Sequence, residues 1–444
     1  MAKTSILKLS EINSENRIDA DYFKQEYLEL DKKIAKMDYK NLNKLGFITD
    51  GSHEIRKYIE KGVIFLRVQD FFEESLDIKE IVYISKEDDD LLKRCKPKEN
   101  DILITKTGKI GVALVVTHDF IDCNIPADIA IIKLKEKINP FFLSLYINSL
   151  IGRKLIERNF SGMGRQRIVL ENLRKIKVPI IKQFDQEELG KKVLEVYSLM
   201  NKSKQKYNEA EERLNKELKI PKIKYNKIFI KSFLDIWKNK RIDAEYYKPK
   251  YEWIIKNIEK MGCIYIRDNN IKDRNFKLNE KQKYKYIELA NINQALGLVE
   301  DFIVDYGSEL PSRARQIVKE DDIIISSIEG SLNSSALIKG EQNNSLCSTG
   351  FFVINIEEYN PEFLVILMKN ELIQSLLKRG CSGTILTAIS KEELKRIPLP
   401  KIEQNIQKDI SLLIKQSNEL YFKAKNLMNE AKDELEKLIN QSNI

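Results

Sequence analysis

Residues 161–168 read SGMGRQRI and place Arg165, Gln166 and Arg167 in a row behind two glycines. Glycine widens the conformations open to a loop. An arginine side chain can form two hydrogen bonds with guanine, and a glutamine side chain can do the same with adenine. The stretch therefore contains residue types that read base edges. A solvated loop that only caps a domain explains it equally well.

Two further stretches in the first half, DGSHEIRKY and KTGKIG, combine basic side chains with turn sequence. Their candidate DNA contacts are His53, Arg56, Lys57, Lys106 and Lys109. KTGKIG lacks the GxxxxGK[ST] spacing of a nucleotide-binding loop, so a turn between strands is the favoured interpretation. A basic turn of this kind can still contact a DNA phosphate.

The second half carries comparable stretches with other side chains: KDRNFKLNEKQK, PSRARQ, SSIEGSLNSS and SGTILTAI. The candidates in these stretches are Arg274, Asn275, Lys277, Arg313, Arg315, Ser331, Asn333, Thr384 and Thr387. The two arginines of PSRARQ alternate, which puts them on one face of an extended chain. Hydroxyl and amide groups can bond phosphates or base edges. DNA contact and plain solvent exposure both remain open for these positions.

The composition offers little to an enzyme. Five cysteines without a CxxC pair and two histidines in 444 residues disfavour a disulfide framework, a zinc site and histidine-based catalysis. NPFF at Asn139 resembles a motif of adenine methyltransferases, but its second proline is missing, so helix capping is favoured. We expect no catalytic residue and no metal site. The net charge of +9 permits phosphate binding without requiring it.

The elements that must hold these residues occur twice. NRIDADYF at Asn16 returns as KRIDAEYY at Lys240, and a constant offset, which carries Asp101 onto Asp322, aligns most of the remaining chain with itself. DILITKTG aligns with DIIISSIEG, and ENLRKIKVP aligns with EELKRIPLP. A repeat of this length indicates a duplicated domain rather than a solenoid. One scaffold with different loops suggests the same task on two different targets.

Each copy is expected to be mixed α/β. GVIFLRVQDF, DILITKT, GVALVVT and ADIAIIKLK are rich in β-branched and aromatic residues, as are their counterparts in the second copy, and this predicts strands. The apolar spacing of NPFFLSLYINSLIGRKLIER predicts one helix over residues 139–158. A long charged helix then ends each copy, with Asp185 and Glu188 as a possible capping box for the first.

The two long helices carry apolar side chains at alternating spacings of three and four residues, as in a coiled-coil seam. The seam residues are Leu189, Val193, Met200, Tyr207 and Leu214 in the first helix and Ile410, Ile414, Tyr421, Met428 and Leu435 in the second. Packing of each stripe on its own domain is the alternative. The predicted fold is thus two duplicated α/β domains, related by a pseudo-two-fold axis and joined by two long antiparallel coiled-coil helices.

The predicted boundaries are 1–184 and 220–404 for the two domains, and 185–219 and 405–444 for the helices. Helices of about 35 residues make a rod of roughly 50 Å, which equals about 15 base pairs of duplex DNA. The rod could hold two DNA-reading domains at a fixed spacing.

This organisation resembles the specificity subunit of Type I restriction-modification systems, and the resemblance covers essentially the whole chain. It rests on RIDADYF and RIDAEYY, FLRVQD and YIELAN, DILITKTG and DIIISSIEG, KIKVP and RIPLP, and the two terminal helices. The family's order is recognition domain, helix, recognition domain, helix. The resemblance implies a non-catalytic subunit in which each domain reads one half of a split DNA site.

The resemblance also implies partners: double-stranded DNA, two methyltransferase subunits docked on the helices, and restriction subunits. S-adenosylmethionine, ATP and Mg²⁺ would be bound by those partners, and no cofactor by this chain. A protein-binding adaptor with a helical dimerisation rod is the alternative from another class. The absence of a long apolar run and of a secretory N-terminus predicts a cytoplasmic location.

Overall fold

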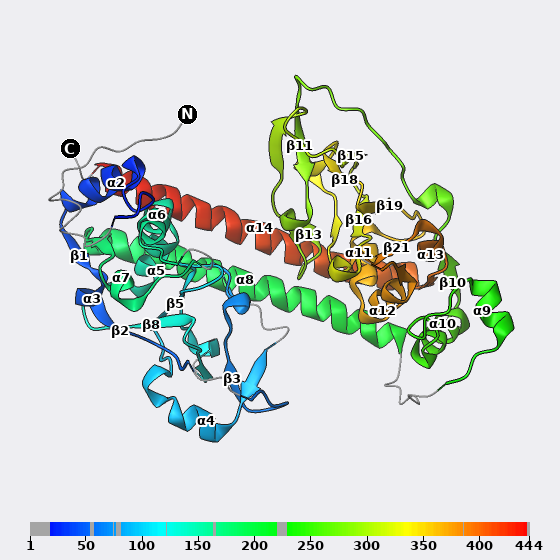
Figure 1. The fold of residues 1–444 in the computed structure, drawn as a ribbon, viewed down its shortest axis with the longest axis horizontal. Coiled ribbons are helices and arrows are strands. Elements are labelled where there is room, and N and C mark those ends of the chain that lie inside the picture. Colours follow the sequence, from blue (N-terminus) through cyan, green and yellow to red (C-terminus); the bar gives the residue numbers. More distant parts are fainter. Residues whose placement is uncertain are drawn as a thin grey trace. The chain divides into compact units, whose positions relative to one another are not determined.

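The structure is a computed structural model, and two compact units form its described part. The described residues are 18–53, 57–73, 75–76, 81–120, 122–162, 166–219, 229–384 and 386–441. The first unit contains described residues up to Asn201 together with those from Leu420 onward, and the second contains Lys202–Glu419. Each of the two long helices visible in Figure 1 gives one part to each unit.

The first unit is built on a four-stranded antiparallel sheet. Its strand order is β2 (Gly46–Asp50), β8 (Ile129–Leu134), β5 (Ile102–Thr105) and β6 (Ala113–Val115). Every residue of β5 and β6 is buried, as their continuous apolar sequence predicts. A smaller sheet has the order β4 (Val82–Ile84), β3 (Val63–Phe65) and β7 (Cys123–Asn124), and β1 (Tyr39–Asn41) pairs with β9 (Lys177–Pro179).

Helices complete the unit, and some of them pack on this sheet. They are α2 (Gln25–Ala35), α3 (Leu42–Leu45), α4 (Lys86–Leu91), α5 (Pro140–Asn148), α6 (Leu150–Arg158) and α7 (Leu170–Arg174). The single helix predicted over residues 139–158 is wrong, because the chain breaks at Ser149. The Ser149 hydroxyl accepts a hydrogen bond from the Gly152 amide at 3.2 Å and donates one to the Tyr146 carbonyl at 2.7 Å. Asn139 caps α5 as predicted, since its side chain accepts from the Phe141 and Phe142 amides.

The second unit has two larger sheets. One has the order β12 (Ile292–Asn293), β13 (Leu298–Val299), β17 (Ser335–Leu337), β16 (Ile323–Ser326) and β19 (Phe351–Ile354). The other has the order β14 (Ile303–Tyr306), β11 (Lys283–Ile287), β18 (Leu346–Ser348) and β15 (Ala314–Ile317). Ile287, Ile324, Cys347 and Val353 belong to one buried cluster, so these sheets share a core.

Shorter pairs and helices complete the second unit. The pairs are β10 (Cys263–Tyr265) with β22 (Pro398–Pro400) and β20 (Cys381–Ser382) with β21 (Ala388–Ile389). The helices are α9 (Phe233–Asn239), α10 (Pro249–Lys260), α11 (Pro361–Lys369), α12 (Glu371–Gly380) and α13 (Lys391–Lys395). Here too the helical stretch after the sheet is split, at Asn370, whose side chain accepts from the Leu372 amide.

The string RIDA(D/E)Y(F/Y), present twice, has the same structural role in both units. Arg158 lies over the Tyr22 ring and donates to the Tyr22 carbonyl at 3.2 Å. Arg379 takes the equivalent position in the second copy, where it lies over the Tyr246 ring and donates to the Tyr246 carbonyl at 3.0 Å. The repeated tyrosine therefore fastens the segment before α2 or α10 to the helix α6 or α12.

The two long helices are α8 (Gln183–Leu218) and α14 (Gln404–Gln441). α8 begins before Asp185, which therefore lies inside its first turn rather than at a cap. In the second unit Ser203 Oγ donates to the Ser417 carbonyl at 2.8 Å, and Ser417 Oγ donates to the Ser203 carbonyl at 2.9 Å. In the first unit Lys423 of α14 pairs with Glu195 of α8 at 3.6 Å.

All seam residues named from the sequence are buried: Leu189, Val193, Met200, Tyr207, Leu214, Ile410, Ile414, Tyr421, Met428 and Leu435. Within each unit the paired segments of α8 and α14 run antiparallel, since Arg213 pairs with Asp409 in one unit and Lys192 pairs with Glu434 in the other. A search of the described helices found none with the length and apolarity that a membrane span requires.

Candidate nucleic-acid interface

A cavity of about 500 Å³ in the first unit brings together three of the predicted residues, His53, Lys106 and Arg167. Its walls come from the ends of β2 and β5, from residues 126–128, and from the segment that leads into α7. These segments are distant in sequence. They meet because strands β2, β8 and β5 are neighbours in one sheet.

Backbone bonds fix the loops around this cavity. Thr107 and Arg167 form an isolated antiparallel bridge, and the Ile168 amide donates to the Lys106 carbonyl at 3.0 Å. The Lys106 amide donates to the Asp128 carbonyl at 2.7 Å, while Thr107 Oγ1 donates to Asp128 Oδ1 at 2.9 Å. The loop that carries Arg167 is therefore held at a set position beside the turn that follows β5.

The cavity lining includes the cations Lys106 and Arg167, and Lys57 precedes its lining residue Tyr58 in the chain. These three cations differ in whether their charge is already paired. Lys106 is only 7% exposed, and its ammonium group is paired with the Asp50 carboxylate. Its charge is therefore already compensated. Lys57 and Arg167 are exposed, and within the described residues neither side chain has an ion-pair or hydrogen-bond partner. Such cations keep their full charge for an anionic ligand.

The other candidates of the first unit fall into three groups. His53 and Gln166 are exposed. Lys109 is exposed too, and its Nζ lies 3.9 Å from the centroid of the Phe72 ring, as a cation–π contact. Arg56 and Arg165 lie outside the described residues.

In the second unit, candidate DNA contacts from two separate stretches of sequence lie side by side at one edge of a sheet. Asn275 forms a bridge with Gln316, and the Phe276 amide donates to the Arg315 carbonyl at 2.7 Å. Residues 274–276 thus extend the sheet alongside β15. This places exposed Asn275 and Lys277 next to exposed Arg313 and Arg315. Across the described chain, the side chains of these four residues have no ion-pair or hydrogen-bond partner.

Arg274 belongs to the same stretch but is engaged inside the unit. Its guanidinium group is paired with both carboxylate oxygens of Asp322, with Nη2 3.3 Å from Oδ1. Asp322 is 1% exposed, so this arginine neutralises a buried charge. Arg274 is therefore a support for the exposed residues beside it.

The remaining candidate DNA contacts of this unit lie in residues 326–335 and 384–387. Ser331 is buried and shares a hydrogen bond of 2.7 Å with Ser326, whereas Asn333 and Thr384 are exposed. Thr387 is half-buried, and its carbonyl accepts from the Glu329 amide at 3.0 Å. The Arg313 carbonyl accepts from the Thr349 amide at 2.9 Å, and Ser327 donates to the neighbouring Gly350, so the two groups of candidates are linked.

One backbone bridge occurs at equivalent positions in the two units, while the side chains at those positions differ. The Thr107–Arg167 bridge of the first unit reappears as an Ile328–Ala388 bridge, and the offset of the sequence repeat relates both pairs of positions. A threonine and an arginine in one unit are thus an isoleucine and an alanine in the other. Equivalent backbone bridges therefore hold different side chains in the two units.

Several residues of the cavity carry no signal in the sequence. Ser52, Tyr58, Phe65 and Asp128 line it together with the predicted residues. Their positions follow from strand pairing, because β3 and β7 lie in parallel and residues 126–128 come just after β7. A tyrosine or an aspartate in a loop has no spacing that would single it out.

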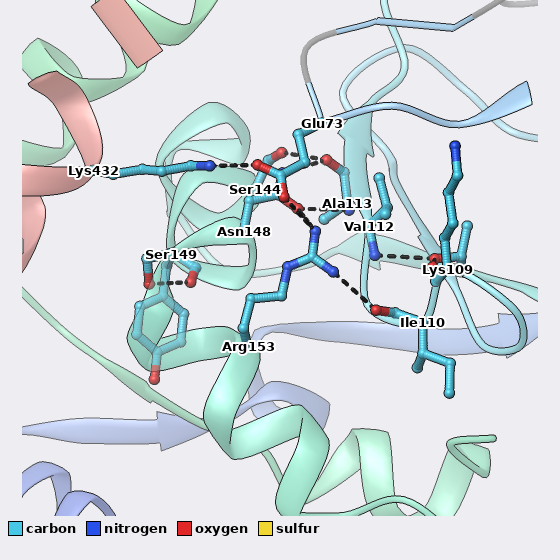
Figure 2. A network of polar contacts seen from close by, with 12 residues as sticks. Glu73, Lys109, Ile110, Val112, Ala113, Ser144, Asn148, Ser149, Arg153 and Lys432 are labelled. Carbon is cyan, nitrogen blue, oxygen red and sulfur yellow. Dashed lines mark hydrogen bonds and ion pairs between the residues drawn. The ribbon is translucent and has the colours of Figure 1, made fainter. Parts of the chain in front are cut away.

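A polar network anchors the loop after β3 to the long C-terminal helix (Figure 2). Glu73 accepts from Arg153 Nη2 at 2.7 Å and is also paired with Lys432 of α14. Arg153 Nη1 donates to the Ile110 carbonyl at 2.8 Å, and Asn148 bonds both backbone groups of Ala113. Burial acts to raise the pKa of Glu73, but Lys432 and Arg153 outweigh it and hold that pKa below its ordinary 4.5.

We expect Glu73→Gln to lower the free energy of unfolding at pH 7 by about 1–3 kcal/mol, because two cations lose their partner. A carboxylate whose pKa is lower in the folded protein than in the unfolded protein stabilises the fold at pH values above its unfolded pKa. That stabilisation is lost as the pH falls through the folded pKa. The difference in the free energy of unfolding between the wild type and Glu73→Gln should therefore shrink below about pH 4.5. Urea unfolding followed by far-UV circular dichroism from pH 7 to pH 3.5 measures this. Glu136→Gln, which removes an exposed pair with Lys40, is the control and should cost at most about 0.5 kcal/mol.

Comparison with known proteins shows which sequences this chain resembles. No family model matches the chain. The Type I restriction enzyme EcoBI specificity subunit of Escherichia coli is 30% identical to it over 158 residues, which is 35% of this chain and 33% of that protein. The chain thus spans about a third of the length of this curated relative. The resemblance to Type I specificity subunits, first seen in the repeated strings, is confirmed by this relative.

Two solved structures align with most of this chain at low identity. The S subunit of a Type I restriction-modification system from M. genitalium aligns over 91% of this chain and 96% of its own, with 14% identity and a TM-score of 0.42. The HsdS subunit from Thermoanaerobacter tengcongensis aligns over 91% and 96%, with 12% identity and a TM-score of 0.27.

Proposed function

We propose that this chain is the sequence-specific DNA-binding subunit of a Type I restriction-modification complex. Each unit would read one half of a split, asymmetric site, through Arg167, Gln166, Lys57, His53 and Lys109 in the first and Arg313, Arg315, Asn275 and Lys277 in the second. Asn333, Thr384 and Thr387 would add neutral contacts. Arg56 and Arg165 remain candidates from the sequence. Lys106, Arg274 and Ser331 would support their loops.

The observation that carries this proposal is the pair of equivalent bridges, Thr107–Arg167 and Ile328–Ala388, which hold different side chains on one backbone frame. A fixed frame with exchanged side chains is what two readers of different sequences need. Unpaired cations beside each frame supply the phosphate contacts that position a duplex. We infer that the two units arose by duplication, are related by a pseudo-two-fold axis, and correspond to recognition domains 1–184 and 220–404.

The long helices would set the gap between the half-sites and would dock two methyltransferase subunits, with restriction subunits joining the complex. The chain would bind no cofactor and would neither methylate nor cleave DNA alone. S-adenosylmethionine, ATP and Mg²⁺ would act on the partners, and the complex would work in the cytoplasm.

Exchange of the first recognition domain tests the proposal that each unit reads one half-site. The segment 1–180 is replaced by its counterpart from a related subunit, and the chain is purified with its methyltransferase partner. Methylation of a random-sequence library should then change at one half-site only. A change at both half-sites, or at neither, would contradict the assignment of one reader to each unit.

The salt dependence of DNA binding tests the cations separately. If Arg313 contacts a phosphate, Arg313→Ala should reduce the slope of log Kd against log salt by about 1. Arg396→Ala is the matched control, because Arg396 is already paired with Glu393 at 2.8 Å and its loss should leave the slope unchanged. Fluorescence anisotropy of labelled duplex between 50 and 300 mM salt gives both slopes. A wild-type chain that binds no duplex at any salt concentration would instead favour the protein-binding adaptor.

A further inference from the structure

The repeat preserves one junction in both units, the place where the helix after the sheet begins against a long helix. In the first unit the Asn139 backbone amide donates to Gln186 Oε1 of α8 at 3.3 Å. In the second unit the Asn360 backbone amide donates to Gln407 Oε1 of α14 at 3.0 Å. The offset of the sequence repeat relates both pairs of residues. The start of α5 on α8 is therefore equivalent to the start of α11 on α14.

The capping bonds at this junction differ between the units. The Asn139 side chain accepts from the first two amide groups of α5 at 3.0 and 3.1 Å. The Asn360 side chain makes no such bond to α11. Its two equivalent amides belong to the buried residues Glu362 and Phe363, and no described residue accepts a hydrogen bond from them. Buried amides without an acceptor are costly, so these two call for a partner.

Two exchanges on the long helix explain the missing cap. Gly190 of α8 lies so close to the Asn139 carboxamide that an added Cβ would be 2.5 Å from its Oδ1. The equivalent residue of α14 is Ser411, so its side chain takes the place of the cap and points at the start of α11. Glu187, which accepts from Asn139 Nδ2 at 3.0 Å, has Lys408 as its equivalent. The groups that hold the cap in the first unit are thus a hydroxyl and an ammonium group in the second.

These two residues line a cavity of about 490 Å³ at the start of α11. Ser411 is 4% exposed, and its Oγ has no hydrogen-bond partner in the described part of the chain. Lys339 and Lys415 line the same cavity. Lys408 is exposed, and its side chain has no ion-pair or hydrogen-bond partner among the described residues. Hydrogen-bond donors and positive charge therefore meet at the uncapped end of α11.

Three carboxylates also line the cavity, and each of them already has a cation. Glu362 lies 3.3 and 3.6 Å from the ammonium groups of two of the lining lysines. Asp321 is paired with Lys339. Asp409 is paired with Arg213 of α8. The two uncapped amides, the serine hydroxyl and one unpaired lysine remain, and all of them can donate.

We propose that this cavity binds a small phosphate-class oxyanion, held by the two uncapped amides of α11, Ser411 Oγ and Lys408 Nζ. The start of a helix favours negative charge, and its free amides point at an anion. The anion would do for α11 what the Asn139 side chain does for α5. The site lies away from the residues proposed to read DNA, since Asp321 precedes β16 whereas Ser331 and Asn333 follow it. It goes beyond the proposed function and does not depend on it.

Titration of the full chain with inorganic phosphate, at an ionic strength held constant with KCl, tests the site. Phosphorus NMR should show one saturable site with a Kd of about 1 mM or tighter. Ser411→Gly should weaken binding at least about tenfold, because it gives Asn360 the room to cap α11 that Asn139 has on α5. No saturable binding by the wild type, or unchanged binding by Ser411→Gly, would overturn the site.

A matched pair of lysine variants separates a site from diffuse attraction. Lys408→Gln should weaken phosphate binding by about threefold to tenfold. Lys256→Gln is the control, because Lys256 on α10 is exposed, does not line the cavity, and is also unpaired within the described chain. It should leave the Kd unchanged within about twofold. Equal losses in both variants would show a general attraction of phosphate to a basic surface and would overturn the site.

A second substitution keeps the test informative if Ser411→Gly is damaged. Adding Asn360→Ala to Ser411→Gly removes the restored cap and frees the two amides of α11 again. The double variant should therefore bind phosphate more tightly than Ser411→Gly alone. A misfolded protein would not recover in this way. No recovery would overturn the exchange of a side-chain cap for an anion.

Competition identifies the source of the phosphate group. ATP that displaces inorganic phosphate would assign the site to the terminal phosphate of a nucleotide, whereas no displacement would assign it to the free anion. Displacement by duplex DNA would make the cavity a backbone contact and would overturn this inference. A chain that binds phosphate as described but binds no duplex would leave this inference standing, and only the proposed recognition of DNA would fall.

Discussion

Arg274→Met is expected to lower the free energy of unfolding of the second unit by about 2–4 kcal/mol, because it leaves a buried carboxylate without its cation. Asp322 is 1% exposed, and the Lys319 amide, 2.7 Å away, would remain as a donor to it. One backbone amide does not compensate a full negative charge. Methionine keeps most of the volume of the arginine stem, so lost packing contributes little.

Both tryptophans, Trp237 and Trp253, belong to the second unit, so urea unfolding followed by tryptophan fluorescence reports on that unit. Arg315→Met is the control: Arg315 is exposed and unpartnered within the described residues, and its loss should cost at most about 0.5 kcal/mol. In DNA binding the order should be reversed, so Arg315→Met should weaken binding more than Arg274→Met does. A stable Arg274→Met protein with weakened DNA binding would show that Arg274 is itself a contact.

The second large effect concerns the gap between the two half-sites that we propose for the units. Seven residues inserted into α8 after Asn201 and seven into α14 after Glu419 keep the seam in phase, because the seam repeats every seven residues. Each insertion lengthens its helix by about 10.5 Å, which corresponds to about three base pairs. The preferred gap should grow by that amount. Affinity for the original site should fall more than 100-fold, since the contacts of one half-site are lost.

Binding selection from a library of gap lengths measures the new optimum. An insertion of four residues in each helix is the control, because it rotates the seam out of phase and should impair folding rather than give a new gap. Both half-site sequences should stay the same in the seven-residue variant. Altered base preference with an unchanged gap would contradict a ruler role for the helices.

Local patterns in the sequence predicted helices and strands correctly where the spacing of apolar residues alone determines the element. DILITKT and ADIAIIKLK became the buried strands β5 and β8, and the alternating stripes became the buried faces of α8 and α14. The helix expected over residues 139–158 failed at Ser149. There a side-chain hydrogen bond to a local backbone group competes with helix continuation, and apolar spacing does not reveal this.

The site was harder to predict, because exposure depends on partners that are distant in sequence. Lys106 and Arg274 have the same basic character as Arg167 and Arg313. They differ only because Asp50 and Asp322 fold against them, and no local pattern reveals those pairs. Asp128 and Tyr58 entered the site through strand pairing alone. Residue type therefore suggested the chemistry, and tertiary contacts decided which side chains are free to perform it.

The sharing of α14 between the units also bears on how the protein is synthesised. Lys432 and Glu436 contact Glu73 and the start of α6, so the first unit includes residues made hundreds of codons after its sheet. That unit cannot reach its final form on the ribosome until residues 420–441 have emerged. During translation its uncovered helix face would need protection, and a nonsense mutation late in the gene would damage the domain encoded first.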